Sequence, residues 1–280
     1  MEYERIGLSV PEILLPRQGA DLTRWAVVAC DQYTSQPGYW ERVKRFVGSA
    51  PSTFHLILPE AYLEESDPLK EAERISASMN EYLEQGVLVS QGPGFVLVER
   101  TTARGAVRRG LMVALDLECY DFHKNSRSLI RATEGTVVDR LPPRIKIREN
   151  APLEAPHIMV LIDDPKKTVI EPLFAGELET VYDFDLMENS GHVRGYRIRR
   201  KETLDAVARA LERLADPALF AEKYGVEGKD VLLYAMGDGN HSLATAKEIW
   251  EAMKNTAADR KAVMDHPARY ALVELVNLHD

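Results

Sequence analysis

The chain up to residue 115 alternates short apolar runs with longer segments of helical periodicity. Apolar runs bounded by turn residues are typical of buried strands, and apolar positions three or four residues apart indicate an amphipathic helix. The runs predict buried strands at 25–30, 54–58, 95–98 and 111–115, the last two paired around a turn at 104–105. The periodicity predicts a helix over 69–83, which Gly86 ends, and another helix near 39–46.

The middle of the chain is irregular, and clear patterns return after it. Between residues 123 and 156 prolines and charges are dense. Later patterns predict a strand at 157–162 with a hairpin partner at 168–174, strands at 179–186, 192–199, 231–236 and 270–276, and helices at 204–214 and 243–253. This order predicts an α/β fold of the mixed α+β kind, with a mixed sheet flanked by helices and a hairpin-rich middle region. We expect residues 1–280 to form a single domain, with a subdivision near 120–156 as the alternative.

Composition indicates a globular protein and excludes several other classes. Of the 280 residues, 45% are hydrophobic and 28% charged, which is ordinary usage rather than that of a disordered chain. No apolar run approaches the roughly 20 residues of a spanning helix, and the charged N-terminus lacks the order of a signal peptide. The two cysteines, Cys30 and Cys119, lie in apolar runs and cannot form a disulfide framework. We therefore expect a cytoplasmic protein without membrane association.

The net charge indicates which class of binding partner to expect. A net charge of −9 argues against nucleic acid, because binding to phosphate backbones requires clustered Lys and Arg. One basic run, 194–201, has the alternation of an exposed edge strand. The expected partner is a small molecule.

The best candidate for chemistry is the loop at 237–242, between the strand at 231–236 and the following helix. Its residues are Gly237, Asp238, Gly239, Asn240, His241 and Ser242. A strand, a glycine turn and a helix start present backbone N–H groups and a positive dipole end to an anion. The two glycines permit positive φ and close approach of a ligand. We assign phosphate binding to Gly237, Gly239, Asn240 and Ser242.

The same loop carries two candidate catalytic side chains. Asp238 and His241 project beside the expected anion position, where a base is useful. The alternative is a plain Asp-Gly turn in which Asn240 or Ser242 caps the helix. Against that alternative, no acidic residue follows three positions after either one to complete a capping box. We favour the functional interpretation.

Two further segments supply candidate ligand-binding residues. Arg131, Arg140 and Arg144 lie near Glu134, and guanidinium groups bind phosphate or carboxylate bidentately. A solvated charged loop is the alternative there. Asp31 follows the expected strand at 25–30, where ligands of open α/β sheets bind. The alternative is a helix cap at residue 34 or 35. We assign Glu134 to catalysis, and Asp31 and the three arginines to substrate binding.

Other motifs are absent. The seven histidines show no zinc-ligand spacing, and no Gly-x-Ser-x-Gly elbow occurs. The loop at 237–242 is neither a Walker P-loop nor a dinucleotide fingerprint. We predict no metal site of the protein's own. The pattern leaves room for Mg²⁺ on Asp31, Glu134 or Asp238, but only alongside a phosphate.

Segments 25–35, 131–144 and 235–247 resemble the uncharacterised domain-of-unknown-function family 1015, and the resemblance spans nearly the whole chain. It implies that members continue beyond the strand near Tyr270, so this chain looks shortened at its C-terminus. Many members carry Asp-Gly-His-His-Arg at 238–242, a form similar to the phosphate-contacting loop of the ParB-like and sulfiredoxin superfold. This superfold includes nucleotide-binding switches and free-serine kinases. Asn240 and Ser242 depart from that form, so Arg131, Arg140 or Arg144 would supply the missing guanidinium.

The leading hypothesis is a small-molecule phosphotransferase, either a kinase or a phosphatase. The loop would hold a nucleotide or phosphate, Glu134 or Asp238 would be the base, and the arginines would neutralise charge. The resemblance also implies serine-related metabolism, because members often lie beside serine-biosynthesis genes. The alternative is a non-catalytic nucleotide- or metabolite-binding regulator. A DNA-associated protein is a third hypothesis, which the acidic charge counts against.

Overall fold

The protein is built around a mixed β-sheet. The computed structural model describes residues 2–155 and 157–280, and over these residues the sheet has eleven strands. Its path runs β10-β11-β5-β6-β13-β9-β12-β8-β7, with β2 paired to β6 and β1 to β2, while β3 and β4 form a separate ribbon. The strands are β1 (Glu2–Tyr3), β2 (Leu8–Ser9), β3 (Glu12–Pro16), β4 (Leu88–Pro93), β5 (Phe95–Thr102), β6 (Val107–Asp116), β7 (Tyr120–Asp121), β8 (Ile130–Arg131), β9 (Met159–Ile162), β10 (Glu179–Asp185), β11 (Gly191–Ile198), β12 (Tyr234–Asp238) and β13 (Tyr270–Asn277).

The directions of the strands differ between the two halves of the sheet. Hairpin β5–β6 is antiparallel, as the sequence predicts, with Leu97 opposite Leu111. Hairpin β10–β11 is antiparallel as well. β13 is antiparallel to β6 and parallel to β9, so it joins the two halves. β12 is antiparallel to β9 and parallel to β8. The predicted mixed sheet flanked by helices is confirmed.

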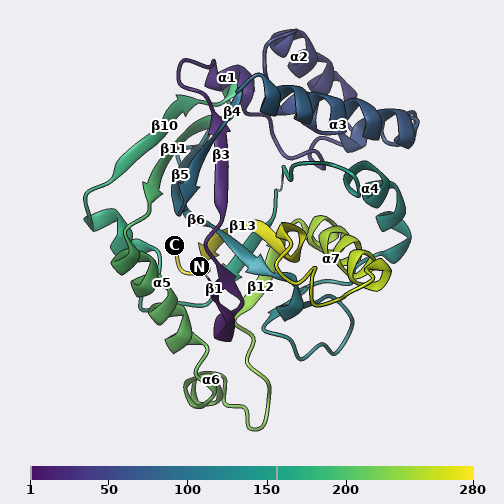
Figure 1. Cartoon of the computed structure of the whole chain (residues 1–280). Helices are drawn as coiled ribbons and strands as arrows, with labels where there is room; N and C mark the ends of the chain where they lie inside the picture. The colour runs from purple at the N-terminus through teal and green to yellow at the C-terminus, as the bar shows by residue number, and fades with distance from the viewer. Residues whose placement is uncertain (1, 156) are drawn as a thin grey trace.

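Helices flank this sheet (Figure 1). They are α1 (Leu22–Trp25), α2 (Pro37–Val47), α3 (Pro68–Glu84), α4 (Leu141–Arg148), α5 (Lys201–Leu214), α6 (Pro217–Tyr224) and α7 (Asn240–Thr256). Buried residues of α5 and α7 share one core with Leu97 and Val113. Because successive strand residues face opposite ways, Val96 and Val98 lie on the other face, where they pack with Ile13 of β3. Smaller cores form around α3 and α2.

The long helices begin and end where their sequence signals lie. The Asp67 side chain accepts a hydrogen bond from the Leu69 N–H and caps α3, while Ile75 and Met79 bury one face. Gly86, with φ +61°, follows the end of this helix. The predicted helices over 39–46, 69–83, 204–214 and 243–253 are all confirmed.

The predicted strands at 25–30 and 54–58 were wrong. Residues 22–25 form α1, and residues 53–56 form a 3-10 turn. The two segments are joined by hydroxyl groups, because Ser52 Oγ and Thr53 Oγ1 both donate to the Trp25 carbonyl, at 3.1 and 2.9 Å. Thr53 Oγ1 also accepts from the Val27 N–H. Side-chain hydroxyls thus satisfy backbone groups that a sheet ladder would have used.

The predicted hairpin partner at 168–174 was also wrong. The Asp164 carboxylate accepts from the backbone N–H groups of Thr168 and Val169, at 2.5 and 2.9 Å. These bonds fold the segment into a loop, and a 3-10 turn over Glu171–Ala175 follows it.

Three smaller expectations need correction. The strand expected at 231–236 begins later, at Tyr234, and continues to Asp238. The basic run at 194–201 is not an edge strand, because β11 lies between β10 and β5. α2 has Gln36 at its N-terminus, and no side chain caps it, so residues 34 and 35 do not act as caps.

Two findings concern membrane-spanning helices and the cysteines. None of the helices within the described residues combines the length and the apolar character needed to cross a bilayer. Cys30 and Cys119 are free thiols.

Candidate functional site

The glycine loop links the end of β12 to the start of α7. Gly237 and Asp238 belong to the strand, and the helix begins at Asn240. Gly239 has φ +78°, and a Cβ there would lie 3.1 Å from the His157 carbonyl oxygen. Gly237 does not have positive φ, so only one of the two expected left-handed glycines is present. Gly239 is therefore required both by its backbone conformation and by the close approach of the neighbouring chain.

The N-terminus of α7 carries no side-chain cap among the described residues. The Asp238 carboxylate accepts instead from the Gly239 N–H, at 2.8 Å. Neither Asn240 nor Ser242 caps the helix, so the alternative of a plain capped turn is not what the structure shows. The first-turn amides of the helix carry a partial positive charge that no side-chain cap offsets among the described residues.

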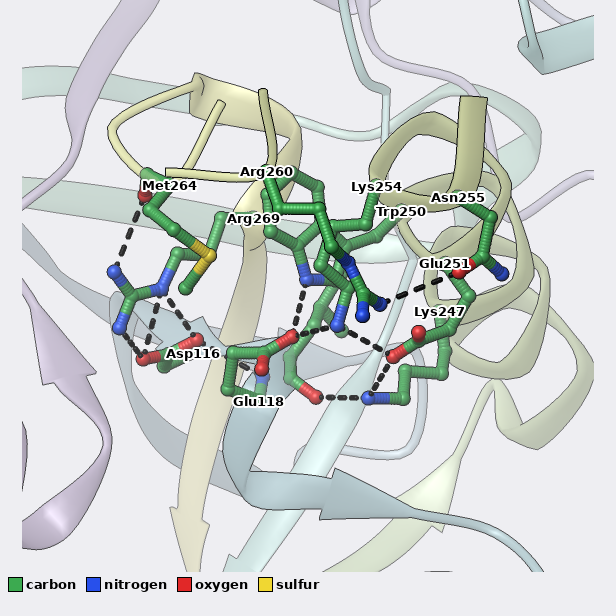
Figure 2. A network of polar contacts seen from close by, with 11 residues as sticks. Asp116, Glu118, Lys247, Trp250, Glu251, Lys254, Asn255, Arg260, Met264 and Arg269 are labelled. Atoms are coloured by element: carbon green, nitrogen blue, oxygen red, sulfur yellow. Dashed lines mark hydrogen bonds and ion pairs between the residues drawn. The ribbon is translucent and has the colours of Figure 1, made fainter. Parts of the chain in front are cut away.

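α7 itself is fixed on the sheet by a polar network at its C-terminal half (Figure 2). The Glu118 carboxylate accepts from Trp250 Nε1 at 2.6 Å and pairs with Lys254. Beside it, Arg269 makes a bidentate contact with Asp116, with a shortest distance of 2.6 Å. Trp250 is fully buried, so the helix axis is held at a fixed position while its other end meets the loop.

The segment that precedes α4 covers the glycine loop. Thr133 Oγ1 donates to the Met236 carbonyl at 2.7 Å, and Glu134 Oε1 accepts from Asn240 Nδ2 at 3.2 Å. Asn240 is only 6% exposed, yet its Oδ1 atom has no hydrogen-bond partner among the described residues. Buried polar atoms are almost always paired, so this acceptor marks a place where a donor is missing.

Three arginines at intervals of four residues follow this segment. Arg148 Nη1 donates to the Ser242 carbonyl at 2.8 Å, and Arg144 Nε donates to Glu60 at 2.9 Å. Arg140 lies just before α4, is exposed, and makes no side-chain hydrogen bond or ion pair within the described residues. α4 thus aligns one free and two anchored guanidinium groups along the loop.

His241 lies among these positive charges. Burial, followed by the charges of Arg144 and Arg140, lowers the pKa of His241 from its ordinary value, against an opposing contribution from Glu60 and Glu134. The imidazole is therefore neutral at pH 7, and its Nε2 atom accepts from the Val137 N–H at 3.4 Å.

A second histidine, His157, approaches the loop from the other side. Its Nε2 atom is 3.3 Å from Asp31 Oδ2, and its Nδ1 atom is 3.9 Å from Cys30 Sγ. Burial lowers the pKa of His157, but hydrogen bonds to Asp31 and Cys30 outweigh it and raise this pKa well above its ordinary value. Burial likewise opposes ionisation of Asp31, and the contact with His157 lowers the Asp31 pKa. The pair is an imidazolium and a carboxylate next to Gly239.

Two of the three predicted carboxylates contact the loop directly, and the third contacts a residue whose backbone lies beside Gly239. Asp238 contacts the Gly239 amide, Glu134 contacts Asn240, and Asp31 reaches the loop through His157. Only two of the three predicted arginines lie at this site. Arg140 and Arg144 lie beside His241, and Arg131 lies elsewhere. Its guanidinium donates to the carbonyls of residues 230 and 231, before the start of β12 and at the opposite end from the loop.

Several residues at this site escaped the sequence reasoning. Arg148 had a usable signal, because it continues the four-residue spacing of Arg140 and Arg144 on one helix face. Glu60, Cys30 and His157 had none, since their contacts are with residues distant in the sequence.

The sequence was also compared with models of known protein families. A model of the family described as a protein of unknown function, DUF1015, matches residues 14–280. The chain belongs to the DUF1015 family. Comparisons with curated proteins and with solved structures find no match.

The three segments that carry the DUF1015 resemblance meet at one place in the fold. Segment 25–35 brings Asp31, segment 131–144 brings Glu134 and Arg140, and segment 235–247 is the loop with the start of α7. Within the described residues of this DUF1015 protein, no group of three or more His, Cys, Asp or Glu side chains could hold a metal ion. The site combines the uncapped N-terminus of α7 and the Arg140 and Arg144 guanidinium groups with the Asp238 and Glu134 carboxylates.

Proposed function

We propose that this protein is a small-molecule phosphotransferase, a kinase or a phosphatase, that holds a phosphate group at the N-terminus of α7. The observation that carries the proposal is the first turn of this helix, which no side chain caps among the described residues. Uncapped helix starts bind anions through their amides and dipole. Arg140 adds an uncommitted positive charge at the same place.

The carboxylates suit a transfer to a hydroxyl group. Glu134 is exposed, and within the described residues only its Oε1 atom is hydrogen-bonded, to Asn240. The Oε2 atom of Glu134 would take the proton of the attacking hydroxyl group. The hydroxyl oxygen would then bond to phosphorus as the bond from phosphorus to the leaving group breaks. Asp238 is the second candidate base, because its Oδ2 atom has no hydrogen bond to any described residue. Neutral His241 would position the ligand through its ring N–H.

The substrate class follows from the resemblance rather than from the geometry. A small hydroxy amino acid such as serine would be the acceptor, and a nucleotide the donor. The described residues offer no preformed metal site, so Mg²⁺ would arrive with the nucleotide and be held mainly by its phosphates. The alternative, a regulator that binds nucleotide without turnover, uses the same loop but needs no base.

Thermal melts with phosphate, ADP, ATP and phosphoserine test binding, each with and without Mg²⁺. A ligand that binds only the native state stabilises it by about 2.7 kcal/mol at a hundredfold excess over Kd. Arg140→Gln should weaken binding by about tenfold, since charge-assisted hydrogen bonds are worth about 1.5–3 kcal/mol. Arg45→Gln is the matched control, because Arg45 is also exposed and unpaired among the described residues. Unchanged melts with every phosphate compound would remove the basis of this proposal.

Turnover separates the enzyme from the regulator. Glu134→Gln should leave ATP binding intact and reduce phosphate transfer to serine by about a hundredfold or more, the usual contribution of a general base. Asp238→Asn serves as the comparison, because whichever carboxylate is the base shows the larger loss. Binding without any transfer or hydrolysis by the wild-type protein would favour the regulator.

A further inference from the structure

A second candidate site lies on the sheet face that carries β3 and β4, away from the glycine loop. A cavity of about 530 Å³ opens between the sheet and the segment from the end of β3 to α1. Its walls are mostly apolar and include Leu22, Trp25, Met112 and Phe184. Ligand pockets are typically of this volume, about 300–1,000 Å³, with an apolar lining and a few polar groups.

Two glycines in one row across the sheet make room for side chains that line the cavity. Gly195 of β11 pairs with Val98 of β5, and Val98 pairs with Gly110 of β6. A Cβ at Gly195 would overlap the Tyr182 ring at 2.1 Å, and a Cβ at Gly110 would overlap the Glu274 carboxylate, where two side chains now lie in the space. The absence of side chains at these two positions therefore lets the Tyr182 phenol and the Glu274 carboxylate lie across the sheet and line the cavity.

The next row on the same face carries the charges. Arg100 of β5 and Arg108 of β6 are cross-strand partners, and both line the cavity. Arg108 is neutralised by Glu274, with Nη2 2.9 Å from Oε2. Arg100 makes no hydrogen bond or ion pair among the described residues, and its Nε atom is buried without a partner. Burial, and then the Arg108 charge, lower the pKa of Arg100, against an opposing contribution from the Glu274 charge. The guanidinium is a partly buried cation without a carboxylate of its own among the described residues, because Glu274 is paired with Arg108.

We propose that this cavity binds an organic carboxylate with an apolar body, with the carboxylate on Arg100 and the body against the apolar walls. The fork of a guanidinium matches a carboxylate, and one negative charge balances that of the partly buried Arg100. The cavity lining also includes Arg17, but this residue is exposed to solvent. The site is distinct from the phosphate site proposed above, since the cavity lining includes no residue of the glycine loop.

Trp25 provides a direct readout because it lines the cavity, whereas Trp40 and Trp250 are fully buried elsewhere. We would titrate the protein with octanoate, octan-1-ol and octyltrimethylammonium while following tryptophan fluorescence, and repeat the titrations by calorimetry. Octanoate should saturate and bind at least about tenfold tighter than octan-1-ol, the difference expected from a charge-assisted pair. The cationic probe should not bind.

Variants locate the effect. Arg100→Met should lower octanoate affinity to that of octan-1-ol. Arg104→Met, a matched change at an exposed position of the same hairpin, should leave it unchanged. Val193→Trp fills the cavity and should abolish binding of both probes. Equal affinity for octanoate and octan-1-ol, equal behaviour of the two arginine variants, or no saturable binding at all would each overturn the proposal.

Discussion

Replacement of Gly239 by alanine tests whether the close approach of the chain to the loop is real. The structure gives two separate reasons for a cost. Residue 239 has φ +78°, and a left-handed conformation costs a non-glycine residue about 1–2 kcal/mol. In addition, its Cβ would lie 3.1 Å from both the His157 oxygen and the Ile158 Cα atom, which are backbone atoms that cannot rotate away.

Two other glycines separate these contributions. Gly105 has φ +83° and nothing within 4 Å of its Cβ position, so Gly105→Ala should lower the free energy of unfolding by only about 1 kcal/mol. The lower conformational entropy of the unfolded alanine variant offsets part of this loss. Gly237 lacks positive φ, and its Cβ would meet the flexible Leu161 side chain at 3.0 Å. Gly237→Ala should therefore be within about 1 kcal/mol of neutral. Gly239→Ala carries both contributions, and we expect a loss of about 2–4 kcal/mol.

Urea denaturation at constant m-value measures all three changes in the free energy of unfolding. The expected order of cost is Gly239→Ala, then Gly105→Ala, then Gly237→Ala. If Gly239→Ala cost no more than Gly105→Ala, the contact with the His157 segment would carry no energy. The loop would then be an ordinary turn, and the reasoning that brings Asp31 to the site through His157 would fail.

Two further predictions concern the supports of the site. Glu118→Ala should lower the free energy of unfolding by about 2–3 kcal/mol, because it removes a hydrogen-bond acceptor from the nearly buried Lys254. Glu212→Ala, at an exposed helix position, is the control and should leave this free energy nearly unchanged in the same urea assay. The pKa of His157 is raised from 6.5 to about 10, so the stability from its pairing with Asp31 is fully present below pH 6.5 and is lost as pH rises toward 10. His157→Gln should flatten the decline in urea midpoint between about pH 7 and about pH 9, and an unchanged decline would contradict the pairing.

Sequence periodicity predicted the elements whose faces are buried against one core. Ile75 and Met79 recur at helical spacing because both lie under one face of α3, and the same logic held for α5 and α7. It failed at 25–30 and 54–58, where apolar residues are buried but the hydroxyls of Ser52 and Thr53 bind the backbone. Apolar content reports burial, and it does not say whether a neighbouring strand is present.

The sequence predicted those parts of the site whose residues are close together along the chain. The loop at 237–242 follows from its glycines and the flanking strand and helix. Arg148 was missed because no helix was predicted between residues 123 and 156, although Pro142 and Pro143 lie at the first turn of α4, where proline is compatible with a helix. His157 could not be predicted, since its role depends on contacts with Asp31 and Gly239 that only the folded chain creates.

The position of β13 between β6 and β9 bears on how the chain reaches this fold. Hairpin β5–β6 closes across a short turn, whereas Tyr270 must find Asp116 and Glu274 must find Met159 from far along the chain. Pairings between distant segments form slowly because loop closure precedes any gain from the contact. Until β13 inserts, β6 and β9 present open edges that another chain can extend, which favours aggregation. Substitutions in β13 are therefore expected to reduce the yield of folded protein before they reduce its stability.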